Sequence, residues 1–284
     1  MDEAQAIHAA TVSDASSVYG DDGVPLDDPA ETYHEASKLY PSTIARQVAG
    51  SIALAASPEL QASARRAVKR NLNRRAHALP PPEHCGVTLA EALWARRSER
   101  GFGAGELRLC ELATVLHAAY GVTHAASAED PQPLRAVPSG GALYPLEVYA
   151  VLARVEEAEA GLYHFDPLRH ALEVLSLGDS PRAVLKEAAI YPEIVDGCAA
   201  TLLVTGMFWR SRFKYGLRGY RFTLLEAGHL VQNVLLTCTA LGLAAVPIGG
   251  FYDRPVDELL GVDGVNESVV YAVSLGRPST AERT

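Results

Sequence analysis

Arg96-Arg97-Ser98-Glu99-Arg100 places three guanidinium groups within five residues of a chain whose formal net charge is −9. An arginine keeps its charge at any working pH and can donate two hydrogen bonds to one phosphate, and the Ser98 hydroxyl can add another. Arginines near a helix end are more often plain solvated surface. The segment alone is therefore compatible with a phosphate site and with an ordinary surface. Other parts of the sequence are needed to distinguish the two.

Predicted helices lie on both sides of this segment. Residues 89–97 and 108–119 carry apolar side chains at helical spacing, and a longer amphipathic helix is predicted over 222–241, with Gly242 suited to a left-handed helix end. Runs that alternate in polarity or are continuously apolar predict β-strands. These runs cover residues 147–154, 162–165, 171–175, 201–208, 244–251 and 269–275. Helices and strands interleave without a strict βαβ repeat, so the sequence predicts an α+β fold built in layers.

The first 80 residues differ from the rest. Residues 1–32 hold eight acidic side chains and no Lys or Arg, which predicts a loosely attached N-terminal segment. Residues 33–80 are predicted to form a helical N-terminal extension that ends in a triple-proline linker, followed by the main domain over 81–284. The extension carries a basic run, predicted as a solvated helix face, with docking of an acidic peptide or support of a phosphate site as alternatives. The run comprises Arg65, Arg66, Lys69, Arg70, Arg74 and Arg75.

Composition limits the class of protein. With 284 residues, 48% of them hydrophobic and 21% charged, the chain has the profile of a soluble globular protein. Outside residues 1–32 it is close to neutral, so a nucleic-acid partner is not expected. No signal segment opens the chain and no apolar run reaches the ~20 residues that span a bilayer, which predicts a cytoplasmic protein with no membrane attachment. The four cysteines form no Cys-x-x-Cys pair and are predicted to be reduced.

Several familiar sites are absent from the sequence. There is no Gly-x-Gly-x-x-Gly fingerprint, no Gly-x-x-x-x-Gly-Lys phosphate loop and no Gly-x-Ser-x-Gly elbow, so a dinucleotide-binding domain, a P-loop enzyme and a serine hydrolase are not expected. Two Glu-x-x-His pairs occur, Glu31/His34 and Glu226/His229, but no bridging glutamates accompany them and no metal site is predicted. Glu226 and His229 are predicted to form a polar patch on the long helix.

Three further segments favour a flat ligand that carries a phosphate. Pro138-Ser139-Gly140-Gly141 runs into a predicted strand, and its small residues let the backbone approach a planar ring closely. Pro247-Ile248-Gly249-Gly250 ends an apolar strand, where exposed amides could donate to a ring nitrogen. Arg277 follows the last predicted strand and could fold back onto the first arginine segment. For each segment taken alone, an ordinary turn remains the alternative.

Taken in order, these segments resemble the nitroreductase-like flavoproteins over about residues 81–280. The resemblance implies a three-layer fold, with a mostly antiparallel central sheet flanked by helices and FMN bound at a homodimer interface. The loop at residue 138 of one chain is expected to cover the flavin held by the other. The implied cofactor-binding residues are Arg96, Arg97, Ser98 and Arg100 for the phosphate and ring, Pro138, Ser139 and Gly140 for the covering loop, Pro247, Ile248, Gly249 and Gly250 for the amides facing flavin N5, and Arg277 for the closing phosphate contact.

Within that family the chain is similar to the SagB-type dehydrogenases, the azoline oxidases of ribosomal peptide biosynthesis. The similarity rests on residues 214–221, Lys-Tyr-Gly-Leu-Arg-Gly-Tyr-Arg, and on residues 225–233, Leu-Glu-Ala-Gly-His-Leu-Val-Gln-Asn. In that branch an adjacent lysine and tyrosine are tied to activity, and this implies a catalytic role for Lys214 and Tyr215. Consecutive side chains on a regular helix diverge, so the pair is expected in a turn or at a helix end.

The chemistry implied by the resemblance is the two-electron oxidation of a peptide thiazoline or oxazoline to the aromatic azole. A base removes the ring Cα proton, which the adjacent C=N and carbonyl acidify, while hydride passes from Cβ to flavin N5. Two alternatives stay open: an FMN reductase of nitro, quinone or enone substrates driven by NAD(P)H, and a flavin-bearing scaffold for a biosynthetic complex. The expected partners are a second copy of the chain and a peptide or small-molecule substrate, with a cyclodehydratase complex as a further possibility.

Overall fold

The computed structural model describes residues 29–41, 44, 49–65, 68–69, 73–127 and 132–279 of the 284. The chain divides into two units, Met1–Arg46 and Gln47–Thr284. The first unit contains helix α2 (Pro29–Ala36), and residues 1–28 of the predicted acidic segment lie outside the described residues. The predicted domain boundaries after residues 32 and 80 stay predictions.

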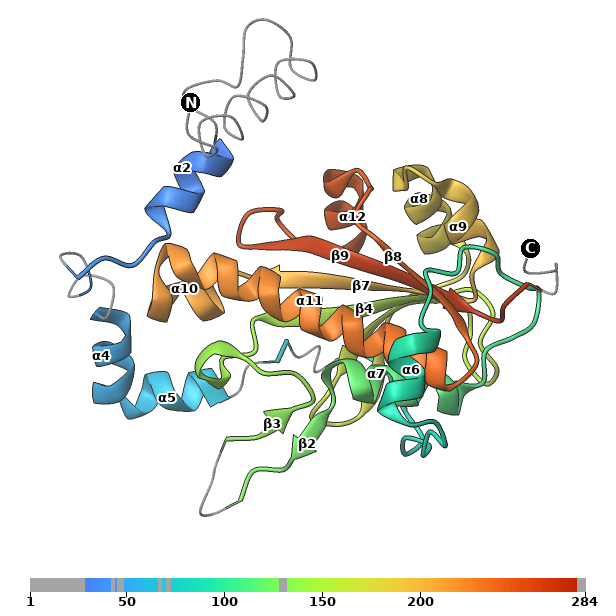
Figure 1. Ribbon diagram of the computed structural model, residues 1–284, viewed down its shortest axis with the longest axis horizontal. Coiled ribbons are helices and arrows are strands. Elements are labelled where there is room, and N and C mark those ends of the chain that lie inside the picture. Colours follow the sequence, from blue (N-terminus) through green and yellow to red (C-terminus); the bar gives the residue numbers. More distant parts are fainter. Residues whose placement is uncertain are drawn as a thin grey trace, which may run out of the picture. The chain divides into compact units, whose positions relative to one another are not determined.

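A seven-stranded sheet forms the centre of the second unit (Figure 1). Its strand order is β1-β6-β5-β4-β7-β9-β8, and all six neighbouring pairs are antiparallel. The strands are β1 (Ala76–Ala78), β4 (Leu146–Leu152), β5 (Gly161–Asp166), β6 (Ala171–Leu177), β7 (Ala200–Met207), β8 (Ala244–Ile248) and β9 (Glu267–Gly276). A smaller sheet pairs β2 (Val122–His124) with β3 (Leu134–Arg135).

Helices cover both faces of the large sheet. Along β4, Val148 and Ala150 belong to the core on one face, and their neighbours Tyr149 and Val151 belong to the core on the other. Side chains alternate between faces along a strand, and both faces are covered here, so all seven residues of β4 are buried. The first face packs against α7 (Leu109–Tyr120) and α11 (Leu217–Ala240), and the second against α8 (Ser180–Ala188), α9 (Pro192–Gly197) and α12 (Asp253–Leu260). The predicted α+β fold in three layers is confirmed.

The predicted strands and the long helix are all present. Helix α11 ends as predicted, because Gly242 after it has a φ of 69°. The structure adds short helices that the sequence analysis did not predict, namely α8, α9, α12 and α10 (Trp209–Tyr215). No helix in the described part of the chain is both long and apolar enough to cross a bilayer. All four cysteines are free, as predicted.

The N-terminal extension is divided rather than continuously helical. Helices α4 (Ala49–Ala56) and α5 (Pro58–Arg65) are followed by strand β1, which pairs with β6. Within the predicted basic run, Arg66 and Arg70 lie outside the described residues. Lys69 does not lie on a solvated helix face, because its side chain reaches carboxylate and hydroxyl groups on the large sheet.

Candidate functional site

The arginine segment begins where helix α6 (Leu89–Ala95) ends. Thr88 and Glu91 form a capping box that fixes the start of this helix, and Arg96 already has a non-helical backbone with φ −53° and ψ 126°. The segment runs beside the C-terminal part of the chain. Gly103 N donates to the Arg277 carbonyl at 2.9 Å, and Ser279 N donates to the Gly101 carbonyl at 3.0 Å. The chain at Arg277 therefore folds back onto this segment.

Two guanidinium groups of the segment donate to nearby backbone carbonyls. Arg97 donates through Nη1 to the carbonyls of Trp94 and Arg96, at 2.9 and 2.8 Å, and Arg100 donates to the Ser98 carbonyl at 3.3 Å. Within the described ranges, no acidic side chain forms an ion pair with any of the three arginines. A hollow of about 130 Å³ is lined by Arg97 of this segment and in part by Glu99, Thr239, Gly242 and Pro278. Guanidinium groups beside a small hollow suit a phosphate.

Arg277 is bound differently from the other predicted phosphate contacts. Its Nη1 and Nη2 donate to the two carboxylate oxygens of Glu111 at 2.9 and 2.8 Å, and its Nε donates to the Glu106 carbonyl at 3.0 Å. Burial opposes ionisation of Glu111, but hydrogen bonds from Arg108 and Arg277 outweigh it and lower the pKa of this carboxyl. One N–H on each terminal nitrogen of Arg277 is left for a further acceptor.

The segment predicted to face the flavin ring lies at the end of β8. Pro247 is half-buried and Ile248 buried, whereas Gly249 and Gly250 are exposed. A Cβ on Gly249 would meet nothing within 4 Å, and the Gly250 carbonyl accepts a hydrogen bond from Ile190 N at 3.2 Å. The backbone after β8 is therefore open to close approach by a ligand, although residues 247–250 do not line the hollow beside Arg97.

Residues 138–144 form a conformationally constrained loop. Gly141 has a φ of 66°, and the non-glycine residues Ala142 and Tyr144 also have positive φ angles, 52° and 45°. Tyr144 is fixed at both ends, because its amide donates to Ser139 Oγ at 2.9 Å and its hydroxyl accepts from Arg135 N at 3.0 Å. Backbone strain of this kind persists where surrounding contacts impose it, and it concentrates at functional sites.

Lys214 and Tyr215 are the last two residues of α10, as expected for a pair at a helix end. Gly216 follows with a φ of 56°. Both side chains reach the constrained loop, since a Cβ on Gly141 would lie 2.6 Å from Lys214 Nζ and 2.7 Å from the Tyr215 hydroxyl. Lys214 Nζ also lies 5.1 Å from the centre of the Tyr215 ring. Two polar tips therefore converge on one glycine, whose positive φ disfavours any residue with a Cβ.

Glu226 of α11 lies beside the same loop. A hollow of about 310 Å³ is lined by Pro138, Ser139, Gly140, Phe222, Leu225, Glu226 and His229. Glu226 is only 2% exposed, and the Tyr120 hydroxyl donates to its Oε1 at 2.7 Å. Burial raises the pKa of Glu226 to about 7, against the lowering effect of hydrogen bonds from Ser139 and Tyr120.

Glu226 and His229, predicted to form a polar patch on the long helix, line this one hollow, with Glu226 buried and His229 exposed. The signal was present in the sequence: Glu226 stands four residues before Leu230, and Leu230 begins the apolar stripe of the long helix. Residues four apart lie on the same helix face, so Glu226 belongs to the buried side.

A second buried polar cluster was not predicted from the sequence. His164 of β5 is fully buried, and its ring nitrogens lie 2.8 Å from Glu147 Oε2 and 3.0 Å from Glu173 Oε2. Burial lowers the pKa of His164, but the two carboxylates outweigh that effect and raise it overall. The three residues come from β4, β5 and β6, which are neighbours only in the folded sheet, so no local motif marks them.

The structure gathers the predicted site residues into two main groups. The arginine hollow adjoins Thr239 near the C-terminal end of α11, and the loop hollow adjoins Phe222 near its N-terminal end. At 1.5 Å per residue, these positions lie roughly 25 Å apart along the helix. A single chain thus does not bring the arginine segment and the Lys214–Tyr215 pair to one place.

Comparison with known proteins gives the family. Residues 93–277 match the nitroreductase family. A Methanocaldococcus jannaschii protein named as a nitroreductase, MJ1384, is 37% identical over 176 residues, which are 62% of this chain and 85% of that protein. The microcin B17-processing protein McbC of Escherichia coli is 33% identical over 156 residues, 50% of this chain and 54% of McbC. The trifolitoxin-processing protein TfxB of Rhizobium leguminosarum bv. trifolii is 31% identical over 147 residues, 50% of this chain and 39% of TfxB.

Solved structures agree on the fold. A Ralstonia eutropha protein named as a nitroreductase superposes with a TM-score of 0.60 at 26% identity, over 74% of this chain and 93% of that one. A chain of the E. coli microcin synthetase McbBCD complex with truncated pro-MccB17 superposes with a TM-score of 0.55 at 23% identity, over 88% of this chain and 92% of that one. The family match covers well over half of the sequence and supports an oxidoreductase with a flavin cofactor. The chain belongs to the nitroreductase family.

Proposed function

We propose that this chain is an FMN-dependent oxidoreductase of the SagB type, which oxidises peptide azolines to azoles. The observation that carries the proposal is the convergence of Lys214 Nζ and the Tyr215 hydroxyl on Gly141. An adjacent lysine and tyrosine are the feature by which the sequence resembles this branch of the family. The relatives McbC and TfxB, named for processing microcin B17 and trifolitoxin, support a peptide substrate. The chain spans about half of McbC and less of TfxB, so substrate and partners are part of the proposal.

The residues present fit FMN. Arg96, Arg97 and Arg100 carry positive charge that no acidic side chain of the described ranges neutralises, and Ser98 stands among them with a hydroxyl. These four residues would hold the phosphate, and the exposed backbone after β8 would lie against the ring. When bound, FMN supplies the two-electron acceptor that takes hydride from the azoline Cβ.

The chain's own contribution is proton transfer and positioning. Lys214 and Tyr215 present a nitrogen and an oxygen at one point, where one of them takes the azoline Cα proton and the other orients the ring. The adjoining hollow has apolar walls at Phe222 and Leu225, which suit a small heterocycle. The positive-φ loop fixes Gly141 as the floor of this site.

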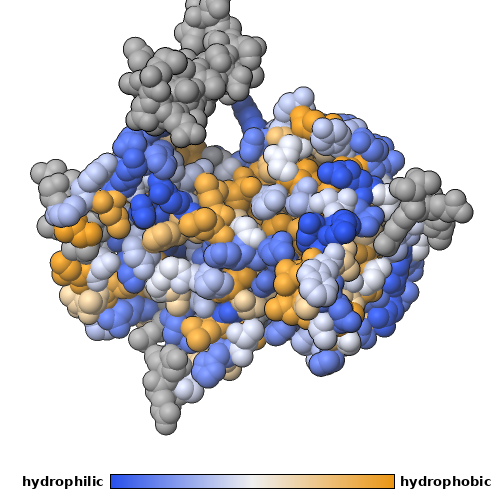
Figure 2. Space-filling view, in the orientation of Figure 1, coloured by the Kyte–Doolittle hydropathy of each residue, from blue (hydrophilic) through white to orange (hydrophobic). Residues whose placement is uncertain are grey.

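A second copy of the chain completes the proposed site. The arginine segment and the Lys214–Tyr215 pair lie near opposite ends of α11. One flavin therefore meets both sets of residues only if they come from different chains. Exposed apolar side chains supply a surface for such pairing: Leu89, Leu93 and Trp94 on α6, which are 68%, 50% and 78% exposed, and Leu225 on α11, which is 55% exposed. Apolar patches are visible on the face that carries α11 and α6 (Figure 2). A cyclodehydratase is the further partner we propose for the assembly.

Anaerobic reduction of the bound flavin tests the proposal. A synthetic peptide with one internal thiazoline should bleach the visible absorbance of the holoprotein, whereas NADPH should not. Rapid bleaching by NADPH and none by the thiazoline peptide would replace the oxidase with a reductase. Flavin that neither compound bleaches would favour the scaffold. Replacing both catalytic residues, Lys214→Ala with Tyr215→Phe, should abolish bleaching while the flavin stays bound.

A further inference from the structure

The N-terminal extension packs directly behind the Lys214–Tyr215 pair. Helix α4 of the extension contacts α10, and Gly50 stands at the contact. A Cβ at Gly50 would overlap the Phe213 carbonyl oxygen and lie 2.9 Å from Lys214 Cα. Those partners are backbone atoms, which cannot swing aside as a flexible side chain does. Any side chain at position 50 must therefore change how α4 and the end of α10 pack against each other.

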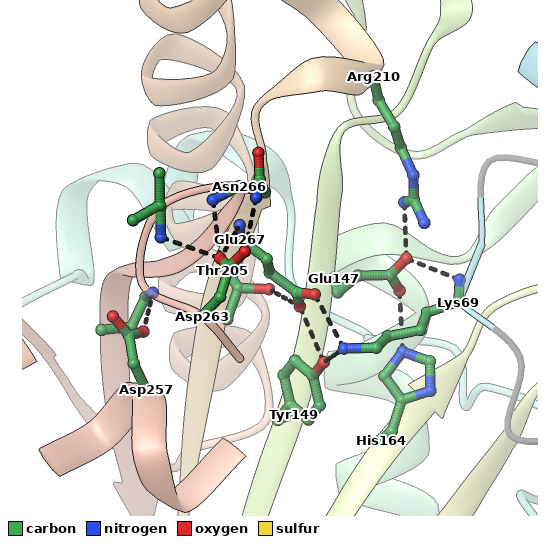
Figure 3. Close-up of polar contacts among 12 residues, drawn as sticks. Lys69, Glu147, Tyr149, His164, Thr205, Arg210, Asp257, Asp263, Asn266 and Glu267 are labelled. Atoms are coloured by element: carbon green, nitrogen blue, oxygen red, sulfur yellow. Dashed lines mark hydrogen bonds and ion pairs between the residues drawn. The ribbon is translucent and has the colours of Figure 1, made fainter. Parts of the chain in front are cut away.

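A second contact from the extension reaches the sheet below α10. Lys69 Nζ donates to the Tyr149 hydroxyl at 2.9 Å and to Glu267 Oε2 at 2.8 Å, and both acceptors are buried (Figure 3). The Lys69 backbone amide donates to Glu147 Oε1 at 2.7 Å. Lys69 is thus tied to two strands of the sheet, to β4 through Glu147 and Tyr149 and to β9 through Glu267. The hydroxyl of Thr205 on β7 donates to the same Glu267 at 2.9 Å.

The same carboxylate that accepts from Lys69 also holds α10. Glu147 Oε1 lies 2.6 Å from Arg210 Nη1, and Glu147 Oε2 lies 2.8 Å from His164 Nε2 (Figure 3). Burial opposes ionisation of Glu147, but Arg210 and His164 outweigh it and hold its pKa at about 2. Arg210 stands four residues before Lys214 on α10, so both side chains leave the same face of the helix.

We propose that Gly50 and Lys69 are positioning residues for the Lys214–Tyr215 pair, and that α4 and Lys69 of the extension are a working part of the proton-transfer site. Gly50 sets how closely the end of α10 can approach the extension. The Lys69 ammonium binds Tyr149 and Glu267 and so holds the Lys69 backbone amide against Glu147, the carboxylate that pairs with Arg210. The inference rests on the proposed function, because it assigns the extension a task only if Lys214 and Tyr215 carry the chemistry.

The test compares Gly50→Ala and Lys69→Met in the full-length holoprotein. Turnover of the thiazoline peptide should fall by roughly 100-fold in kcat, with KM and flavin content unchanged, since a displacement of about 1 Å in a catalytic group has an effect of that order. The pH profile of kcat should shift as well, which a purely stabilising role would not cause. Lys69→Arg keeps a cation at the same place and should restore most of the activity.

Matched controls carry the same chemical changes elsewhere. Gly86→Ala adds a methyl group where nothing lies within 4 Å, and Lys186→Met removes an exposed lysine that pairs with Asp196 at 3.2 Å. Both should behave as the wild type. If Gly50→Ala fails to fold, as circular dichroism would show, Lys69→Met decides the question, because it acts through a different contact.

A readout that needs no turnover separates this inference from the proposed function. The rate at which a water-soluble anhydride acylates Lys214 is followed against pH by peptide mass spectrometry, with Lys186 as the internal standard. Both extension variants should change the profile of Lys214 and leave that of Lys186 unaltered. Unchanged Lys214 profiles together with wild-type kcat would overturn the inference. Full turnover in Lys214→Ala with Tyr215→Phe would instead overturn the proposed function.

Discussion

Glu226 is a buried carboxyl that the fold keeps close to its neutral form. Tyr120 and Ser139 donate to it, and Arg135 lies over the rings of Tyr120 and Tyr144, with its guanidinium carbon 4.3 and 4.6 Å from their centres. These groups lower the pKa of Glu226, but the effect of burial is larger. Burial therefore raises the pKa from 4.5 to about 7. The carboxyl therefore binds a proton in the folded chain at pH values where the unfolded chain has released it.

The consequence is a stability that falls as the pH rises. Between pH 4.5 and 7 the folded state binds more protons at this site, so the free energy of unfolding decreases across that window by up to about 3 kcal/mol. Glu226→Gln should remove this part of the slope in urea unfolding measured at several pH values. Glu187→Gln, an exposed change on α8, is the control and should leave the slope intact. Parallel slopes for wild type and Glu226→Gln would contradict the assignment.

The arginine segment makes a separate prediction about cofactor affinity. A hydrogen bond to a charged group contributes about 1.5–3 kcal/mol, so Arg96→Ala, Arg97→Ala and Arg100→Ala should each weaken FMN binding by roughly 10- to 100-fold. The loss should shrink at high salt, because part of it is screened electrostatic attraction. Fluorescence titration of the apoprotein with FMN measures both effects. Arg254→Ala, which removes a 90% exposed side chain paired with Glu258, should bind FMN as the wild type does.

The turn that ends α11 offers a prediction that depends on backbone conformation alone. Gly242 has a φ of 69°, and a Cβ there would meet nothing within 4 Å, so crowding plays no part. Gly242→Ala should lower the free energy of unfolding by about 1 kcal/mol, the cost of holding an L-residue in the left-handed region. The urea midpoint measures this cost, and Gly86→Ala serves as the comparison because its methyl group also points into open space. Equal midpoints for the two variants would contradict the conformational account.

Elements with clear hydrophobic periodicity could be predicted from the sequence, whereas several short elements that depend on tertiary contacts could not. The predicted strand at 201–208 is β7 at 200–207, and the predicted helix at 222–241 is the greater part of α11. By contrast, β1 has three residues and exists only because β6 lies beside it. Helix α10 has seven residues and depends on packing against α4 and α11. Isolated helices of that length are unstable in water, so tertiary contacts determine whether they form.

The same reasoning explains which site residues could be predicted. Lys214, Tyr215 and the arginine segment stand in compact motifs, and the sequence shows them directly. Lys69 and Glu147 are 78 positions apart and meet only once the extension lies on the sheet. No local pattern can indicate such a pair, because the contact is a property of the topology rather than of spacing.

The distribution of site residues over the whole molecule predicts that flavin binding and dimerisation are lost together. Trp94 on α6 is 78% exposed, and Leu225 on α11 is 55% exposed and also borders the hollow beside the constrained loop. A charge placed at either position would have to be desolvated in a subunit interface, so Trp94→Asp and Leu225→Asp should yield monomers. Those monomers should release FMN, because the arginine segment and the constrained loop of one flavin site would no longer meet.

Sedimentation velocity with detection at the flavin absorbance follows both events in one experiment. Val265→Asp, at a residue that is 76% exposed and outside both hollows, should remain a dimer with FMN bound. Monomers that keep FMN and full turnover would show that one chain suffices for the site.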